Sequence, residues 1–267
     1  MSDYNITDLL SPAFLERMQK MLGDEYEDFI KSYEAPRTYG LRVNTAKISC
    51  EEFEKIVPFP VTPIPWIPNG YFYPGDVRPS FCPLYQAGLY YLQEPSAMTP
   101  ASCLPVTPGE NILDLCAAPG GKSLHAADKM QGEGMVDSRD LTDYKVGLIE
   151  ENIERTQTMN IRAYRKDATI LDKESIEKAD IVLADVPCSG LGVIGKKTDI
   201  KYRTDEDKIQ ELSVLQKRIL HNAASYVKPG GVLIYSTCTI TREENQDNVA
   251  WFTENYPFVL ESLDPYL

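Results

Sequence analysis

Short apolar segments and longer amphipathic segments alternate along the last two-thirds of the chain. The apolar segments have the length and the Ile, Leu and Val content of buried strands, and the amphipathic segments repeat their apolar residues every three to four positions, as helices do. We predict strands at residues 111–115, 134–140, 163–166, 181–185, 232–236 and 258–262, and helices at residues 85–98, 142–159, 205–227 and 241–255, with a further helix ending near residue 130. This alternation predicts an α/β fold with a doubly wound parallel sheet.

The first 84 residues have a different pattern, which predicts a small α+β module ahead of that sheet. We predict a helix interrupted at Gly23, then a strand, a short helix and a proline-rich segment of extended or hairpin structure, at residues 11–31, 39–47, 49–56 and 58–79. We therefore expect two units, an N-terminal module at residues 1–84 and a larger domain at residues 85–267.

A glycine-containing loop follows the first strand of the predicted sheet, with the sequence Cys116-Ala117-Ala118-Pro119-Gly120-Gly121-Lys122. Glycine lets the backbone approach a ligand closely, and the helix that follows offers N–H groups to an anion. Asp140 and Asp167 end the next two strands, where carboxylates can bind ribose hydroxyls and an adenine amino group. Because the loop is neither a P-loop nor a G-x-G-x-x-G loop, we expect adenosine without phosphates, as in S-adenosylmethionine. The alternative is that these residues only cap helices and form turns.

Two cysteines, Cys188 and Cys238, each follow a strand of the same predicted sheet, and Asp185 ends the strand before Cys188. Ligands bind at the carboxyl ends of such strands, so we expect both thiols beside the cofactor. C5 of cytosine is a poor nucleophile. A thiolate that adds at C6 raises the electron density at C5, which can then attack a sulfonium methyl group, and a second group assists activation or release. Asp185 can hydrogen-bond N3 of the base or the cofactor, and the spacing leaves open which thiol attacks.

Composition narrows these hypotheses. The chain has 267 residues, six cysteines without a C-x-x-C pair and two histidines, so we expect neither a metal site nor disulfides. No apolar run approaches the roughly 20 residues of a membrane span, and no signal peptide is recognisable, so we expect a cytoplasmic protein. The net charge of −13 argues against a generally basic surface, and Lys196, Lys197, Lys201 and Arg203 form a candidate local basic cluster.

Three motifs, in this order, resemble the Sun-type family of RNA cytosine-C5 methyltransferases. They are Asp-Leu-Cys-Ala-Ala-Pro-Gly-Gly-Lys at residues 114–122, Asp-Val-Pro-Cys-Ser-Gly at 185–190 and Tyr-Ser-Thr-Cys-Thr at 235–239. Residues 39–45 and 85–98 resemble the bacterial RsmF-like branch, which modifies small-subunit ribosomal RNA. The resemblance implies a Rossmann-like domain that binds S-adenosylmethionine, preceded by an RNA-recognition-like module.

The resemblance also implies roles for the predicted site residues. Cys238 would be the nucleophile, and Cys188 would promote product release. The cofactor contacts would come from Cys116 through Lys122, Asp140, Asp167 and Asp185, the last serving the cofactor, the cytosine or both.

The same resemblance sets expectations for the end of the chain. Sheets of this type finish with an antiparallel hairpin whose last strand inserts beside the fifth strand, and we find no candidate for that strand after residues 258–262. RsmF-like chains continue into a C-terminal RNA-binding region, so we expect this chain to be truncated. The alternative functions are a catalytically weak RNA-binding or ribosome-assembly factor, a transfer RNA cytosine-C5 methyltransferase, and a methyltransferase for a protein or small molecule.

Overall fold

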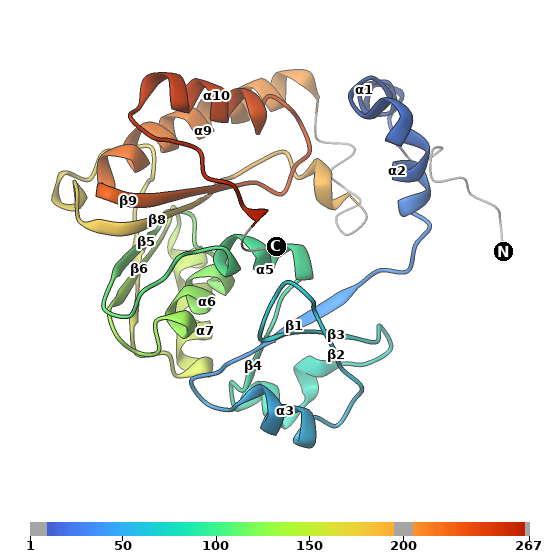
Figure 1. The fold of residues 1–267 in the computed structure, drawn as a ribbon, viewed down its shortest axis with the longest axis vertical. Coiled ribbons are helices and arrows are strands. Elements are labelled where there is room, and N and C mark those ends of the chain that lie inside the picture. The colour runs from blue at the N-terminus through green and yellow to red at the C-terminus, as the bar shows by residue number, and fades with distance from the viewer. Residues whose placement is uncertain (1–9, 195–204, 265–267) are drawn as a thin grey trace.

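The computed structural model describes residues 10–194 and 205–264, which form two sheets with helices around them (Figure 1). The N-terminal sheet is antiparallel, with four strands in the order β2-β3-β1-β4, and the larger sheet is parallel, with five strands in the order β7-β6-β5-β8-β9. In this order, β5, β6 and β7 form one half of a Rossmann-like doubly wound sheet. Strands β8 and β9 lie on the other side of β5. The predicted fold class is therefore confirmed.

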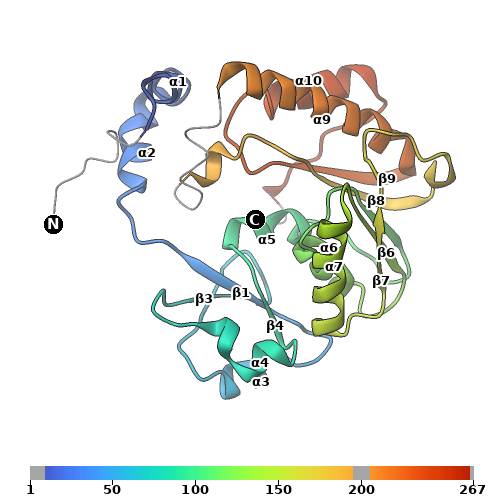
Figure 2. The same ribbon diagram turned by 180° about the vertical axis from the view of Figure 1, so that it is seen from behind.

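Two helices begin the described part of the chain and match the predicted interrupted helix. They are α1 Pro12–Leu22 and α2 Tyr26–Ser32, separated by the 3₁₀ turn η2 Gly23–Glu25. Phe14 and Met18 on α1 pack against Leu191 and Ile209 of the larger domain. Figures 1 and 2 show the pair near one end of α9 and apart from the N-terminal sheet.

The N-terminal module packs its antiparallel sheet against α3. Its elements are β1 Tyr39–Val43, α3 Cys50–Ile56, β2 Thr62–Pro63, β3 Gly70–Tyr73, η3 Pro79–Phe81, α4 Pro83–Gln86 and β4 Tyr90–Leu92. The pairing of β2 with β3 confirms the predicted hairpin structure of the proline-rich segment. Phe53 and Tyr90 are fully buried in the core of this module.

The predicted helix at residues 85–98 is wrong. Helix α4 ends at Gln86, and Gly88 has φ +71°, with the carbonyl oxygen of Arg155 only 2.1 Å from where a Cβ would lie. The chain then forms β4, which pairs with β1. Tyr90 and Tyr91 alternate as strand residues do, so that Tyr90 enters the module core and Tyr91 the core of the larger domain. The division predicted between residues 84 and 85 stays a prediction.

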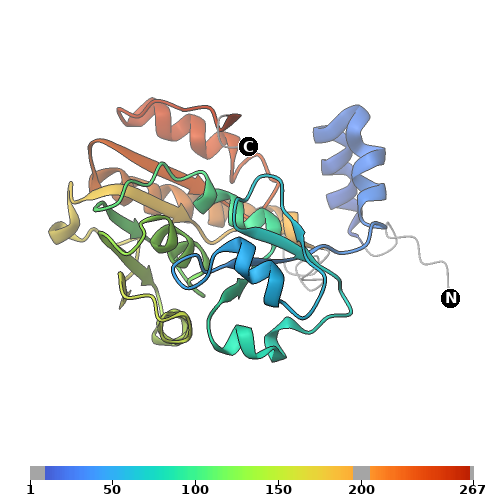
Figure 3. The same ribbon diagram turned by 60° about the horizontal axis from the view of Figure 1, so that its bottom comes forward.

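The larger domain has helices on both faces of its parallel sheet (Figures 1 and 3). Its elements are α5 Pro95–Ser102, β5 Asn111–Asp114, α6 Gly121–Lys129, β6 Met135–Asp140, α7 Asp143–Thr156, β7 Ile161–Arg165, η4 Lys173–Ser175, β8 Ala179–Asp185, η5 Leu191–Val193, α9 Glu206–Tyr226, β9 Val227–Ser236 and α10 Gln246–Asn255. Ile112 packs on the side of α5 and α6, and Leu113 packs on the side of α9. Five predicted strands are confirmed, with bounds shifted by a few residues.

Two predictions for the last part of the chain are wrong. Residues 258–262 form no strand, because Phe258 packs on Phe252 of α10 while Val259 is 89% exposed. The helix predicted from residue 241 begins at Gln246. The Thr241 hydroxyl donates to the Glu244 carboxylate at 2.8 Å, so these residues bond to each other and do not form the reciprocal side-chain and backbone bonds of a capping box.

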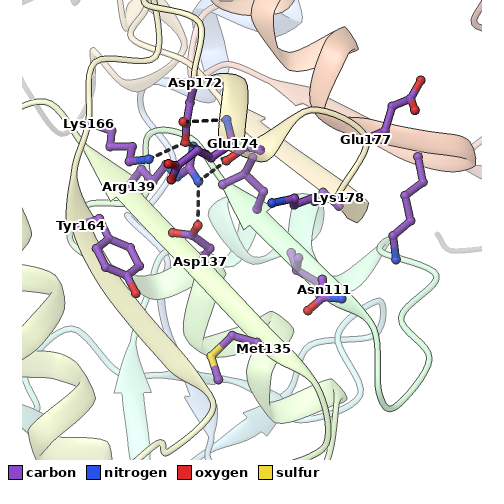
Figure 4. Close-up of a pocket in the computed structure, with 15 residues that line it drawn as sticks. Asn111, Met135, Asp137, Arg139, Tyr164, Lys166, Asp172, Glu174, Glu177 and Lys178 are labelled. Atoms are coloured by element: carbon purple, nitrogen blue, oxygen red, sulfur yellow. Dashed lines mark hydrogen bonds and ion pairs between the residues drawn. The ribbon is translucent and has the colours of Figure 1, made fainter.

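A cavity of about 700 Å³ lies over one face of the parallel sheet (Figure 4). It reaches the amino ends of β5 and β6 at Asn111 and Met135, and the described crossover from β7 to β8 holds the short turn η4 beside it. Its charged groups pair with each other, as Arg139 does with Asp137 at 2.7 Å and with Asp172 at 3.2 Å. None of the predicted catalytic residues lines this cavity.

Candidate active site

The predicted site residues lie at the carboxyl edge of the parallel sheet. Asp140 and Asp185 are the last residues of β6 and β8, Cys116 comes two residues after β5, and Cys238 comes two residues after β9. Asp167 comes two residues after β7. Because all five strands are parallel, these ends meet on one side, which is where ligands bind in doubly wound folds.

The two predicted catalytic thiols are neighbours. The sulfur atoms of Cys188 and Cys238 are 3.0 Å apart, and the backbone N–H of Cys238 donates to the Cys188 sulfur at 3.2 Å. They are not joined in a disulfide. Cys238 is exposed and Cys188 is half-buried, so Cys238 is the more accessible of the two. The Cys238 sulfur, followed by burial, raises the pKa of the Cys188 thiol, so Cys188 holds its proton at neutral pH.

The loop at residues 116–122 makes a tight turn into α6. The N–H of Ala117 donates to Arg139 O at 2.8 Å, and the N–H of Gly120 donates to Ala117 O at 2.7 Å. Gly120 has φ +103°, a left-handed conformation that favours glycine, and it precedes the first residue of α6. The first N–H groups of α6 therefore point out of the turn at the same edge as the thiols, where they can bind a polar ligand.

Asp140 and Asp167 already have hydrogen-bond partners at this edge. The buried Asp140 carboxylate accepts from Ala118 N at 3.0 Å and Leu141 N at 2.7 Å, and it pairs with Lys145 at 2.9 Å. Asp140 thus holds the glycine loop. Asp167 accepts from the hydroxyl and the N–H of Thr169, and these two bonds lower the pKa of its carboxyl.

Asp185 is paired on both oxygens. One accepts from Lys122 Nζ at 2.6 Å and the other from Ser236 Oγ at 2.6 Å. Lys122 is the second residue of α6 and Ser236 is the last residue of β9, so Asp185, the last residue of β8, connects two strand ends with the start of α6. Its side chain remains 30% exposed, which leaves room for a ligand to approach.

Sequence reasoning missed three groups at this edge. Asp114 ends β5 and accepts from Ser123 Oγ at 2.7 Å, and its position before the glycine loop is a signal that could have found it. Ser236 orients Asp185 as described above. Glu244 is fully buried and bonds to Ser189, next to Cys188, and this bond joins positions that are distant in sequence, so no local pattern marks it as part of the site.

Two further predictions concern metal and membrane binding. Among residues 10–194 and 205–264, no group of three or more His, Cys, Asp or Glu side chains is placed to hold a metal ion. In the same part of the chain, no helix has the length and apolar character to cross a membrane. The candidate basic cluster of Lys196, Lys197, Lys201 and Arg203 lies outside the described residues.

Comparisons with known proteins agree with this geometry. The family model described as 16S rRNA methyltransferase RsmB/F matches residues 101–261, and the model described as the N-terminal domain of 16S rRNA methyltransferase RsmF matches residues 10–95. A ribosomal RNA small subunit methyltransferase F from Cronobacter sakazakii is 34% identical, with 95% of this chain and 55% of that protein covered. The chain thus spans about half the length of the curated relatives it matches.

Solved structures show the same fold. A methyltransferase homologue from Pyrococcus horikoshii has a TM-score of 0.84 and 29% identity, over 94% of this chain and 81% of that one. NSun6 from the same organism has a TM-score of 0.82 over 94% of this chain and 91% of that one, and at 22% identity it shows the fold alone. The family model covers more than half of the chain and includes both thiol motifs. The chain belongs to the RsmB/F family of 16S rRNA methyltransferases.

Proposed function

We propose that this chain transfers a methyl group from S-adenosylmethionine to C5 of cytosine in RNA, and that the RNA is small-subunit ribosomal RNA. The pair of thiols 3.0 Å apart at the carboxyl edge of the sheet carries this proposal. Methylation of an amine needs no thiol, whereas C5 of cytosine needs covalent activation and then release. The names of the relatives support ribosomal RNA as the substrate.

The residues present fit an adenosine-containing cofactor. The turn at Gly120 directs the N–H groups of α6 toward the site, and Asp185 offers a partly exposed carboxylate. Asp114 has a buried oxygen, Oδ1, without a hydrogen-bond partner among the described residues, which a ligand donor could use. When bound, S-adenosylmethionine would supply an electrophilic methyl group. Residues 116–122, Asp140, Asp167 and Asp185 would hold it.

The two thiols would then have different roles. The Cys238 sulfur, as a thiolate, would form a bond to C6 of the cytosine, and the electron pair would move to C5, which takes the methyl group. A base would take the C5 proton, and the bond between C6 and the Cys238 sulfur would break with its electron pair returning to the sulfur, which restores the ring and the Cys238 thiolate. Cys188 keeps its proton because the neighbouring sulfur and burial raise the pKa of its thiol, which fits a group that assists release and leaves attack to Cys238.

Asp185 would orient the base or the cofactor. Its carboxylate is fixed by Lys122 and Ser236, and it ends the strand that leads into the Cys188 loop. A fixed carboxylate that is partly exposed can accept a hydrogen bond from the amino group of cytosine. Action on ribosomal RNA would place the protein in the cytoplasm.

We also propose that residues 1–84 form a module that assists RNA recognition and that the catalytic domain follows it. The separate antiparallel sheet supports two units. Because β4 pairs with β1 in that sheet, we place the boundary between β4 and α5, a few residues later than the sequence suggests.

The test is transfer of a tritiated methyl group to 16S ribosomal RNA, transfer RNA or no RNA. We expect incorporation with 16S ribosomal RNA. Cys238→Ala should lower incorporation by more than about 1000-fold, because the covalent route is lost. Cys188→Ala should instead accumulate a protein–RNA adduct that survives denaturing electrophoresis.

Cys50→Ala is the matched control, because Cys50 begins α3 in the N-terminal module, and it should keep wild-type incorporation. Methylation of cytosine C5 by Cys238→Ala would contradict the assigned role. Binding of RNA without any incorporation by the wild-type chain would favour an RNA-binding or assembly role.

A further inference from the structure

Glu244 is a fully buried carboxylate beside both cysteine loops. Its Oε1 accepts from the backbone N–H of Ser189 at 2.8 Å and from the side-chain amide of Gln216 at 2.9 Å. Its Oε2 accepts from the Thr241 hydroxyl at 2.8 Å and from the Ser189 hydroxyl. An ionised carboxylate only accepts hydrogen bonds, so it can take all four of these donors.

The carboxylate sets the direction of a hydrogen-bond chain between the two loops. Ser189 has one hydroxyl proton and gives it to Glu244, so its oxygen must accept from the Thr239 hydroxyl, 2.7 Å away. Ser189 directly follows Cys188, and Thr239 directly follows Cys238. One buried group thus ties together the residues next to both thiols.

Rigid elements hold Glu244 and its partners in place. Gln216, on α9, also donates to Pro187 O at 2.9 Å, so the residues on both sides of Cys188 are held. The Gln216 oxygen accepts from Asn248 of α10 at 2.7 Å, and the Tyr235 hydroxyl donates to Glu244 O at 2.6 Å. Gln216 and Asn248 are fully buried. A site held in this way by buried hydrogen bonds has a fixed geometry.

We propose that Glu244 is a positioning residue that fixes the spacing of the Cys188 and Cys238 thiols. Because Glu244 is fully buried, it would act on the thiols through Ser189 and Thr239. The inference rests on the proposed function in one respect: the spacing matters for methyl transfer only if both thiols act on the same base.

Phenylarsine oxide measures the spacing directly, because its arsenic atom bonds two neighbouring thiols and releases water. We expect Glu244→Gln to weaken phenylarsine oxide binding by at least about tenfold and to lower kcat by a similar factor, because a small misplacement of reacting groups has large effects. KM for RNA should change much less than kcat. Glu243→Gln is the matched control, because the Glu243 side chain pairs with Arg17 at 2.8 Å, and both quantities should stay at the wild-type level.

A folded Glu244→Gln variant, with wild-type circular dichroism and melting temperature, that binds phenylarsine oxide as tightly as the wild type would overturn the inference. If this variant does not fold, Thr239→Val decides. It removes the bond to Ser189 and leaves the four bonds to the Glu244 carboxylate, and unchanged arsenical binding would again overturn the inference. Arsenical binding needs no RNA, so a wild-type chain that binds the arsenical without methylating RNA would reject the proposed function alone.

Discussion

Asp114 is a buried acid at the end of β5, and its environment disfavours the charged form. Burial, with a contribution from the charge of Asp185, raises the pKa of the Asp114 carboxyl to about 7, although the Ser123 hydroxyl and Lys122 act in the opposite direction. Asp114 therefore makes stability depend on pH near neutrality. A proton donor from a bound ligand would relieve this cost.

We expect the stability difference between wild type and Asp114→Asn to change with pH. The folded-state pKa lies above the ordinary value of 3.8, so the folded chain holds the extra proton between about pH 4 and pH 7. The contribution of this group to stability falls as the pH rises through that window, by about 3 kcal/mol. Urea unfolding of the wild type and of Asp114→Asn at pH 4 and at pH 7 measures this change in stability.

The exposed Asp143 provides the control. The free energy of unfolding of Asp143→Asn should change with pH in the same way as that of the wild type. If the free energy of unfolding of the wild type and of Asp114→Asn changed by the same amount from pH 4 to pH 7, Asp114 would not be the source of this pH dependence.

Site residues at the ends of strands could be predicted from the sequence, whereas residues that reach the site only through tertiary contacts could not. Cys188, Cys238 and Asp185 could be placed together because parallel strands end on one side. Glu244 could not, because its partners come from distant parts of the chain. Thr241 and Glu244 have the spacing of a capping box, but in the structure their side chains bond to each other within the buried network.

Among the elements, β1 and α6 are joined by a buried polar cluster that connects the N-terminal module to the glycine loop. Arg42 of β1 donates to Gly121 O at 3.3 Å and pairs with Asp128 at 3.5 Å. Asp128 also accepts from Asn69 at 2.9 Å and Thr45 at 2.7 Å. Burial lowers the pKa of Arg42 to about 10, although the charge of Asp128 acts in the opposite direction, so Arg42 stays charged at neutral pH.

Arg42→Met should lower the free energy of unfolding by about 3 kcal/mol, because it leaves the Asp128 carboxylate buried without its cation. It should also weaken binding of S-adenosylmethionine, since the contact to the Gly121 carbonyl is lost. Chemical denaturation and calorimetric titration measure the two effects.

Arg37→Met is the matched control. Arg37 is exposed and lies over the Tyr39 ring at 5.2 Å, so we expect a loss below about 1 kcal/mol. Equal losses for the two variants would mean that the buried cluster does not stabilise the protein.

The element that sequence reasoning placed wrongly also has a physical explanation. Residues 85–98 carry apolar side chains on helical spacing, but Gly88 and the neighbouring aromatic residues favour a turn and a strand. Tyr90 and Tyr91 each enter a different core, and only the assembled molecule shows both. Long amphipathic segments, such as α7 and α9, were predictable because each packs one face on a single sheet.

At the scale of the whole molecule, the N-terminal module and the larger domain share buried contacts. Tyr91 of β4 packs with residues of α6 and β5. Helix α5 contacts both β1 and α6. Units joined by a common core unfold together, so we expect one cooperative transition.

The two tryptophans of the chain test this, because one lies in each unit. Trp66 packs on Phe72 of β3, and Trp251 lies on α10. Fluorescence of Trp251→Phe reports the N-terminal module, and fluorescence of Trp66→Phe reports the larger domain. Each substitution can change stability, so the urea midpoint of each variant is first corrected for its own change in calorimetric stability. The two corrected midpoints should then coincide, and separate midpoints would show that the units unfold independently.

The short separation of the Cys188 and Cys238 sulfurs has a consequence for redox chemistry. They lie 3.0 Å apart and need to approach by only about 1 Å to bond. Hydrogen peroxide should oxidise the exposed Cys238 to a sulfenic acid, which the Cys188 sulfur attacks with loss of water, giving a disulfide. We expect methyl transfer to stop and to return with dithiothreitol, while peroxide-treated Cys188→Ala forms no disulfide; an unchanged thiol count in the treated wild type would contradict this. Protein purified without a reductant would then be folded and inactive.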